Sequence, residues 1–457
     1  MSSQQIKWEQ ALIEKYNYAG PRYTSYPTAL EFSESYVEAD FQRAVIRYPD
    51  RPLSLYVHIP FCHRLCYFCG CNKIVTRQLH KADRYLDVLE QEICQRAPLF
   101  RQRRVTQLHW GAGTPTFLNK AQITRLVTLL KQHFDVADDA EMSIEVDPRE
   151  IALDVIDHLR ALGFSRLSMG VQDFNKAVQE RINRVQDEDV IFGLMERARQ
   201  QGFSSTSIDL IYGLPLQTPD SFAYTLKRVI DLSPDRLSVF NYAHMPALFA
   251  AQRKIKDEEL PTAQQKLIIL HDTIATLTQQ GYQFIGMDHF AKPQDELAIA
   301  QRAGLLHRNF QGYTTQGDSD LLGLGVSAIS MIGDSYAQNQ KALNAWYENV
   351  TRKGHGLWRG LTLSEDDNLR RDVIKQLICN FSLDFKTVEA QWDIRFSDYF
   401  AEDLALLKPL IADGLVEQSA TGLYVTGTGR LLIRNICMCF DVYLRQKARQ
   451  QQFSRVI

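Results

Sequence analysis

The chain has 457 residues, of which 45% are hydrophobic and 23% are charged, an ordinary globular composition with enough apolar side chain for one large core or two smaller ones. The formal net charge is -2, so no excess of Lys or Arg indicates a nucleic-acid partner or an anionic membrane. These values favour a small-molecule partner.

The first residues, MSSQQIKWEQ, lack the basic and apolar regions of a secretory signal, and no stretch approaches the roughly 20 apolar residues of a membrane span. We therefore expect a cytoplasmic protein. In a reducing compartment, a tight group among the eight cysteines is more typical of metal binding or catalysis than of disulfides. Four of the cysteines lie between Cys62 and Cys71.

The chain is predicted to begin with an irregular arm, residues 1–45, which contains PRYTSYPT. From 46 to 362, short apolar runs alternate with segments of helical period, which is typical of βα units around a parallel sheet. Strands are predicted at 53–59, 107–113, 142–148, 166–172, 206–213, 237–243 and 284–291, and helices at 83–97, 121–134, 154–164, 189–203 and 263–282. The fold class is α/β, a partial TIM-like (β/α) barrel with its chemistry at the C-terminal ends of the strands.

The pattern changes after residue 362 and predicts a small, mostly helical domain over 363–457. Helices near 366–380 and 398–413 precede a hairpin at 415–426 and a last helix over 431–448. This order has a winged-helix look, and one interpretation is a DNA-binding regulator with an iron-sulfur sensor. That interpretation needs a basic recognition helix, whereas the last helix has an apolar face that favours packing against the barrel.

Cys62, Cys66 and Cys69 follow the first predicted strand in a C-x3-C-x2-C spacing, the strongest signal in the chain. Short spacings let one loop hold three irons of a 4Fe-4S cluster through thiolates. The open fourth iron can bind the amino and carboxylate groups of S-adenosylmethionine, and one electron then releases a deoxyadenosyl radical.

Two other metal sites remain open for the same cysteines. Zinc sites more often use paired C-x2-C units, and no second pair is present. A closed cluster with Cys71 as a fourth ligand is geometrically awkward, because only Gly70 separates it from Cys69.

The C-x3-C-x2-C motif resembles that of the radical S-adenosylmethionine superfamily. Further segments, CYFCGCNK, PRYTSYPT, GAGTPT, EVDP, GVQDF, DLIYGLP and HRNFQGYTTQ, resemble bacterial oxygen-independent coproporphyrinogen III oxidases over nearly the whole chain. That family decarboxylates two propionates of coproporphyrinogen III to vinyl groups, giving protoporphyrinogen IX in heme biosynthesis. The resemblance implies a 4Fe-4S cluster, two S-adenosylmethionine molecules per turnover, a reductant of flavodoxin or ferredoxin type, and a monomer.

The resemblance also implies roles for individual residues. Cys62, Cys66 and Cys69 would hold the cluster, while Cys71, His58 and Glu145 would be catalytic. The positions that match contacts with S-adenosylmethionine are Tyr56, Phe68, Ala112, Gly113, Thr114, Glu145, Gln172, Arg184, Asp209, Ala243 and Ile329. Arg22, Phe310 and Gln311 would serve the substrate.

Several of these roles have a physical rationale beside a simpler structural one. Glu145 and Asp209 lie at strand ends, where a carboxylate can bind ribose hydroxyls or an ammonium group, although a helix cap is the plainer alternative. Arg184 and Arg22 would bind carboxylates of the cofactor and of the substrate. Ala112 replaces the middle one of the family's three glycines, and at positive φ it would cost about 1 kcal/mol and weaken cofactor binding.

A heme chaperone on the same scaffold is the alternative function. The chaperones lack the cysteine after the third ligand and the arm with PRYTSYPT, whereas this chain has both. The sequence therefore favours the oxidase.

Overall fold

The computed structural model describes residues 6–446 and residue 455, and it divides into two compact units. We call residues 32–273 and 318–362 the barrel unit, and residues 1–31, 274–317 and 363–457 the terminal unit. One boundary between the units lies at residue 362, and the terminal unit also includes most of the arm and an internal segment. Two hydrogen bonds join that segment to the C-terminal part: Gln301 donates to the Cys379 carbonyl (2.9 Å) and Tyr313 to the Ile378 carbonyl (3.2 Å).

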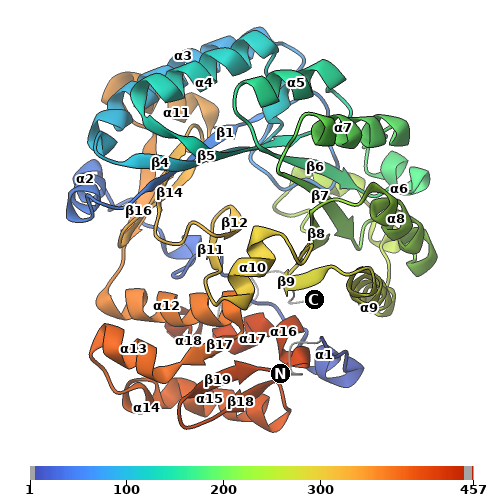
Figure 1. The fold of residues 1–457 in the computed structure, drawn as a ribbon, viewed down its shortest axis with the longest axis vertical. Helices are drawn as coiled ribbons and strands as arrows, with labels where there is room; N and C mark the ends of the chain where they lie inside the picture. The colour runs from blue at the N-terminus through green and yellow to red at the C-terminus, as the bar shows by residue number, and fades with distance from the viewer. Residues whose placement is uncertain (1–5, 447–454, 456–457) are drawn as a thin grey trace. The chain divides into compact units, whose positions relative to one another are not determined.

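A parallel sheet forms the centre of the barrel unit (Figure 1). Six strands lie side by side in chain order: β1 (Leu53–Ile59), β4 (Arg104–Ala112), β5 (Asp135–Val146), β6 (Arg166–Gln172), β7 (Ser205–Tyr212) and β8 (Arg236–Asn241). β13 (Asp320–Leu324) pairs parallel to β1, and β14 (Ile329–Ile332), β15 (Ser335–Asn339) and β16 (Leu357–Thr362) extend the sheet antiparallel. Six of the seven predicted strands are thus confirmed as parallel neighbours.

The seventh predicted strand, 284–291, is wrong as a single strand. It forms β9 (Gln283–Gly286) and β10 (His289–Ala291), an antiparallel pair in the terminal unit. Gly286 has φ 145° and Met287 has φ 54°, and these left-handed conformations reverse the chain between the two strands.

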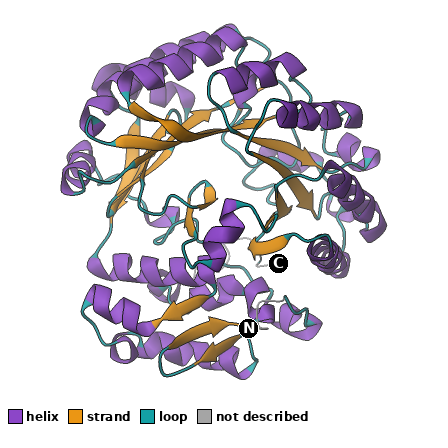
Figure 2. Ribbon diagram, in the orientation of Figure 1, coloured by secondary structure: helices purple, strands orange, loops and turns teal. Residues whose placement is uncertain are grey.

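Helices of the barrel unit line one face of the sheet (Figure 2). They include the predicted α3 (His80–Arg96), α4 (Lys120–His133), α5 (Leu153–Ala161) and α7 (Glu188–Gln200), together with α2 (Glu38–Arg47), α6 (Lys176–Arg181), α8 (Pro219–Leu232) and α11 (Leu343–Lys353); α9 (Ala263–Gln279) was also predicted. The core beneath them contains the fully buried Trp110. Within the described ranges, no helix is long and apolar enough to cross a membrane.

The arm is more regular than predicted, because it contains α1 (Gln10–Tyr16) and most of α2. In α2, Phe41, Ala44 and Val45 are buried, at the spacing of one helix face. Short strands complete the chain: β2 (Phe61–Cys62) with β3 (Ile74–Val75) in the barrel unit, and β11 (His307–Asn309) with β12 (Gly312–Thr314) in the terminal unit.

The C-terminal part of the terminal unit has a three-stranded antiparallel sheet, β17-β19-β18, and helices around it. Its elements are α12 (Glu365–Asn380), β17 (Ser382–Asp384), α13 (Phe385–Trp392), α14 (Phe396–Tyr399), α15 (Ala401–Ala412), β18 (Val416–Gln418), β19 (Gly422–Val425), α16 (Gly427–Leu431), α17 (Ile433–Met438) and α18 (Val442–Gln446). The internal segment of the same unit contains α10 (Glu296–Arg302). The predicted helices near 366–380 and 398–413 and the hairpin are therefore present.

The last predicted helix, 431–448, is broken into three short helices, and residues 447 and 448 lie outside the described part. Asp441 causes one break, because its carboxylate accepts hydrogen bonds from the amides of Tyr443 (3.0 Å) and Leu444 (3.2 Å) and so caps α18. Arg434 on α17 is buried and donates to the Pro21 carbonyl (2.9 Å). This arginine is therefore not available to a nucleic acid.

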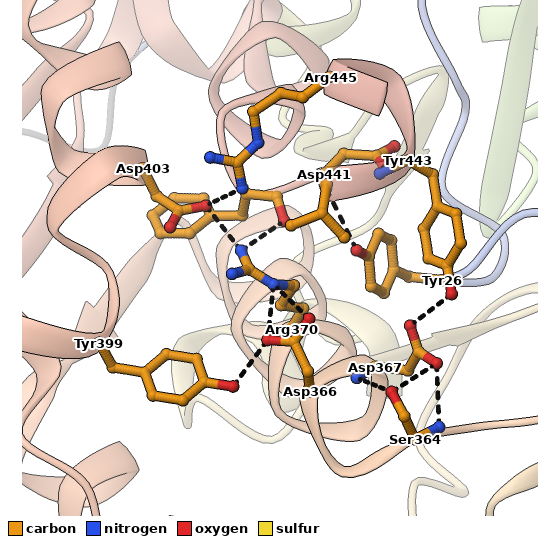
Figure 3. A network of polar contacts seen from close by, with 12 residues as sticks. Tyr26, Ser364, Asp366, Asp367, Arg370, Tyr399, Asp403, Asp441, Tyr443 and Arg445 are labelled. Atoms are coloured by element: carbon orange, nitrogen blue, oxygen red, sulfur yellow. Dashed lines mark hydrogen bonds and ion pairs between the residues drawn. The ribbon is translucent and has the colours of Figure 1, made fainter. Parts of the chain in front are cut away.

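Buried ion pairs link the helices of the terminal unit (Figure 3). The Asp403 carboxylate, 1% exposed, accepts hydrogen bonds from Arg370 (2.6 Å) and Arg445 (2.8 Å). Arg370 also binds Asp366 (2.9 Å), which accepts a hydrogen bond from Tyr399 (2.7 Å). Among the carboxylates labelled in Figure 3, Asp403 alone binds two guanidinium groups at once, so α12, α15 and α18 depend on it together.

We expect Asp403→Ala to destabilise the terminal unit by about 3–5 kcal/mol, because it leaves two guanidinium groups without their shared carboxylate. Chemical unfolding followed by circular dichroism measures this loss. Asp398→Ala is the matched control, since the Asp398 side chain is 71% exposed and lies 3.7 Å from Arg395. Its expected effect is within about 0.5 kcal/mol, and equal effects of the two variants would contradict the assignment.

Candidate active site

The cysteine loop leaves the C-terminal end of β1 and is fixed through its backbone. The Ile74 amide donates to the Pro60 carbonyl (2.7 Å) and the Tyr67 amide to the Ile182 carbonyl (3.0 Å). The Asn183 side chain donates to the Leu65 carbonyl (2.7 Å). Backbone contacts thus hold the loop at both ends and in the middle, which orders its thiols before any ligand binds.

Each of the three motif cysteines has its own hydrogen-bond donor. Cys66 accepts from Arg149 and Arg184, both at 3.4 Å, and Cys62 accepts from Thr114 at 3.5 Å. Hydrogen bonding from Cys71 and the nearby Lys73 charge lower the pKa of Cys69 to about 6, although its burial opposes this. At Cys62 the Thr114 hydrogen bond only partly offsets burial, which raises the pKa of this thiol to about 11. The lowered pKa of Cys69 favours its thiolate, the form that binds iron.

Asp147, which directly follows β5, places the two arginines at Cys66. Its carboxylate pairs with Arg149 (2.6 Å) and Arg184 (3.2 Å), and it is 7% exposed. Burial alone would raise the pKa of Asp147, but the Arg184 charge and hydrogen bonds from Arg149 lower it to about 2. Asp147 therefore stays ionised and keeps both guanidinium groups beside the loop.

Glu145, at the end of β5, faces the glycine-rich turn after β4. It accepts a hydrogen bond from the Ala112 amide (3.0 Å), and its other oxygen lies 3.4 Å from Nε2 of His109. The His109 ring stacks on Tyr56 of β1 at 5.9 Å. Three neighbouring strands thus bring Tyr56, His109 and Glu145 together.

The turn after β4 imposes a positive φ on Ala112 and leaves no space for a side chain at Gly113. Ala112 has φ 86°, the positive φ at which alanine is expected to cost conformational energy relative to glycine. A Cβ at Gly113 would lie 2.6 Å from the carbonyl carbon of Pro60, which leaves no space for a side chain. Glycine at 113 therefore lets the turn pass directly against the start of the cysteine loop, where Thr114 reaches Cys62.

Gln172 and Arg184 meet at the end of β6. A Cβ on Gly170 would lie 2.8 Å from the Gln172 amide nitrogen and 3.2 Å from Nη2 of Arg184, which donates to the Gly170 carbonyl. Nε of Arg184 is buried and has no hydrogen-bond partner among the described residues. An unpaired buried donor is costly, so this nitrogen indicates a missing acceptor such as a cofactor carboxylate.

Asp209 lies inside β7, and its side chain is half-buried. Burial first, and then the Glu145 charge, raise the pKa of Asp209 to about 7. Ser168 donates to its carboxylate at 3.4 Å. Near neutral pH a large fraction of this carboxyl group is protonated and can donate a hydrogen bond as well as accept one.

Phe68 and Ala243 are linked by Gln252, a residue that the sequence did not single out. The buried Gln252 amide donates to the carbonyls of Phe68 (2.9 Å) and Ala243 (3.3 Å). It thereby connects the cysteine loop to the segment after β8.

Ile329 starts β14, and its carbonyl oxygen lies 2.6 Å from the position that a Cβ on Gly323 would occupy.

His58 supports the loop from β1. Its Nε2 lies 3.1 Å from the carbonyl of Asn72, and its Nδ1 lies 3.4 Å from the Ser327 hydroxyl. Burial lowers the pKa of His58 to about 4, so the ring is neutral at physiological pH. The predicted catalytic roles of His58 and Cys71 stay predictions. In the structure, His58 contacts Asn72, the residue after Cys71.

All residues predicted to bind the cluster or the cofactor belong to the barrel unit, whereas Arg22, Phe310 and Gln311 belong to the terminal unit. Arg22 forms an ion pair with Asp288. Sequence reasoning missed Asp147, Arg149 and Gln252. Asp147 lies within the quoted EVDP segment and Arg149 follows it directly, so a charged pair after a strand end was the available signal.

The cysteines fit a cluster better than a single ion. In the described ranges, no three His, Cys, Asp or Glu side chains converge to hold one metal ion. Thiolates that bind separate irons need not converge on one point. The cationic donors at Cys66 and Cys69 also suit a cluster, which carries negative charge from its thiolates and sulfides.

We expect Ala112→Gly to stabilise the cofactor-free protein by about 1 kcal/mol, because glycine adopts φ 86° without strain. Chemical unfolding measures the gain. Ala405→Gly is the control, since Ala405 is exposed within α15 and glycine there should cost about 1 kcal/mol. Destabilisation by both variants would show that the conformation at 112 carries no strain.

We expect Asp209→Asn to remove a pH dependence of stability. The folded pKa of about 7 lies above the ordinary 3.8, so the folded state holds the proton more tightly. The stability that the protein has while the Asp209 carboxyl group is neutral is present in full below a pH of about 4. It is lost as the pH rises to about 7. The melting temperature of the cofactor-free variant should therefore exceed that of the original protein most above pH 7 and least near pH 4. Exposed Asp138 provides the control, Asp138→Asn, and a pH-independent difference for Asp209→Asn would contradict the assignment.

Comparison with known proteins agrees with this site. The model of the Radical SAM superfamily matches residues 56–229, and the HemN C-terminal domain matches residues 363–432. The oxygen-independent coproporphyrinogen III oxidases of Salmonella typhimurium and Escherichia coli are each 73% identical over 457 residues, covering all of both chains.

A solved structure, described as coproporphyrinogen III oxidase (HemN) from Escherichia coli, a radical SAM enzyme, superposes with a TM-score of 0.94 at 70% identity. It covers 96% of this chain and 100% of its own. This chain therefore belongs to the family of oxygen-independent coproporphyrinogen III oxidases within the radical SAM superfamily.

Proposed function

We infer that this chain is an oxygen-independent coproporphyrinogen III oxidase, which decarboxylates two propionates of coproporphyrinogen III to vinyl groups and gives protoporphyrinogen IX in heme biosynthesis. The family relationship over the full length supports this function. The observation that carries it is the loop after β1, where Cys62, Cys66 and Cys69 each have a hydrogen-bond donor.

The family implies a 4Fe-4S cluster and S-adenosylmethionine. Cys62, Cys66 and Cys69 would hold the cluster. A cluster held there would supply the one-electron reducing chemistry by which the family generates a radical from S-adenosylmethionine. Arg149 and Arg184 would donate hydrogen bonds to the Cys66 sulfur and place positive charge beside the cluster.

The residues at the strand ends would bind S-adenosylmethionine. Unpaired Nε of Arg184 would donate to its carboxylate, and Glu145 would accept hydrogen bonds from its amino or hydroxyl groups. Asp209, with its pKa near 7, can accept or donate to a ribose hydroxyl. We assign the same binding role to Tyr56, Phe68, Ala112, Gly113, Thr114, Gln172, Ala243 and Ile329.

Finer features of the reaction belong to the same proposal. Two S-adenosylmethionine molecules per turnover, a flavodoxin or ferredoxin as reductant, and a monomeric protein agree with the family resemblance. Phe310, Gln311 and Arg22 would serve the substrate, and Arg22 would exchange its Asp288 partner for a propionate. Catalytic roles for Cys71, His58 and Glu145 complete the assignment.

Anaerobic reconstitution tests the proposal. With S-adenosylmethionine, a reductant and coproporphyrinogen III, the protein should form protoporphyrin, methionine and deoxyadenosine. Chromatography measures all three products. Cys62→Ser should abolish all three products, because the loop loses one iron ligand. Cys94→Ser is the matched control, since exposed Cys94 lies on α3 away from the loop sequence.

Two outcomes would contradict the oxidase. Cleavage of S-adenosylmethionine with the porphyrinogen unchanged would favour the heme chaperone. Failure to assemble any cluster, with the protein folded, would remove the basis of the proposal.

A further inference from the structure

Two cations in the barrel unit lack an acidic partner. Lys341 follows β15, and Arg359 lies in β16. Nζ of Lys341 lies 5.8 Å, and Cζ of Arg359 4.6 Å, from the centre of the Trp358 ring. In the part of the chain that the structure describes, no carboxylate forms an ion pair with either side chain.

The surroundings of the pair favour an external anion. Arg359 donates to the Gln338 side-chain oxygen (2.8 Å) and lies over the Phe32 ring at 5.6 Å. Burial, and then the Arg359 charge, lower the pKa of Lys341. The Glu34 charge acts on Arg359 and opposes the lowering of its pKa by burial. The Glu34 carboxylate itself accepts a hydrogen bond from the Trp358 indole (3.0 Å). Lys341 is exposed and Arg359 is half-buried, and an anion bound between these two like charges would relieve their mutual repulsion.

The pair is attached to the cysteine loop. The Asn72 side chain donates to the Lys341 carbonyl (3.0 Å), and the Asn72 carbonyl lies 3.1 Å from Nε2 of His58. Asn72 directly follows Cys71. A ligand held by the cations would therefore lie beside the loop that holds the cluster.

We propose that Lys341 and Arg359 bind a propionate carboxylate of coproporphyrinogen III and orient the macrocycle beside the cysteine loop. This inference rests on the proposed function. The planar guanidinium can bind a carboxylate through two hydrogen bonds, and the ammonium adds a second charge. The faces of Trp358 and Phe32 offer apolar contact to a pyrrole ring. The carboxylate of S-adenosylmethionine has the same chemistry, so the test must separate the two.

The test is the double variant Lys341→Gln, Arg359→Gln, assayed with a chemical reductant. We expect the KM for coproporphyrinogen III to rise about tenfold or more, with the KM for S-adenosylmethionine unchanged. Arg352→Gln, Lys353→Gln on α11 removes the same charge and should leave both constants unchanged. The charge-conserving Lys341→Arg, Arg359→Lys variant should recover much of the affinity. Equal iron content and melting temperature establish that the variants are folded.

Three results would overturn the proposal: an unchanged KM for the porphyrinogen, a rise confined to S-adenosylmethionine, or a defect that occurs only with a protein reductant and so marks a docking surface for an acidic protein. If the original protein does not turn over coproporphyrinogen III, the proposed function fails separately. Fluorescence quenching by coproporphyrin III and its tetramethyl ester then still tests the cation pair. Binding of the acid but not the ester, lost in the Gln variant, supports it, and equal binding of both contradicts it.

Discussion

The active site depends on one buried carboxylate. Asp147 is held ionised by Arg149 and Arg184, and these two arginines in turn contact Cys66. A buried charge is tolerated only when it is paired, so the three side chains must be placed together. Because Asp147 follows β5 and Arg184 follows α6, this requirement connects the cysteine loop to two successive βα units.

Backbone shape is the second constraint. Ala112 and Gln172 both have positive φ at the ends of parallel strands, at 86° and 70°. Such conformations are uncommon away from glycine and turn the chain sharply where side chains meet a ligand. At Ala112 the turn also directs an amide to Glu145, so the same conformation orders a carboxylate.

The substrate-side proposals use charge in two different ways. Arg22 already has an acidic partner, Asp288, and must exchange it to bind a propionate. Lys341 and Arg359 form no ion pair with a carboxylate of the described residues, and they need no exchange. The two arrangements suit different tasks. An arginine already paired with a carboxylate changes its partner when a ligand binds, whereas two cations without a carboxylate attract an anionic ligand.

The sequence by itself determined the βα pattern, the loop with Cys62, Cys66 and Cys69, and the chemistry of that loop. Strand periodicity and ligand spacing are local, so they can be read along the chain. It did not predict the turn that splits 284–291 into β9 and β10, nor the cap at Asp441 that breaks the last helix, because a turn or cap residue can be overlooked within an apolar run. The contacts of Arg149 with Cys66 and of Gln252 with Phe68 and Ala243, and the isolation of Lys341 and Arg359 from carboxylates, were decided only by the tertiary structure. These features join residues far apart in the chain, and no local pattern encodes which distant side chains will meet.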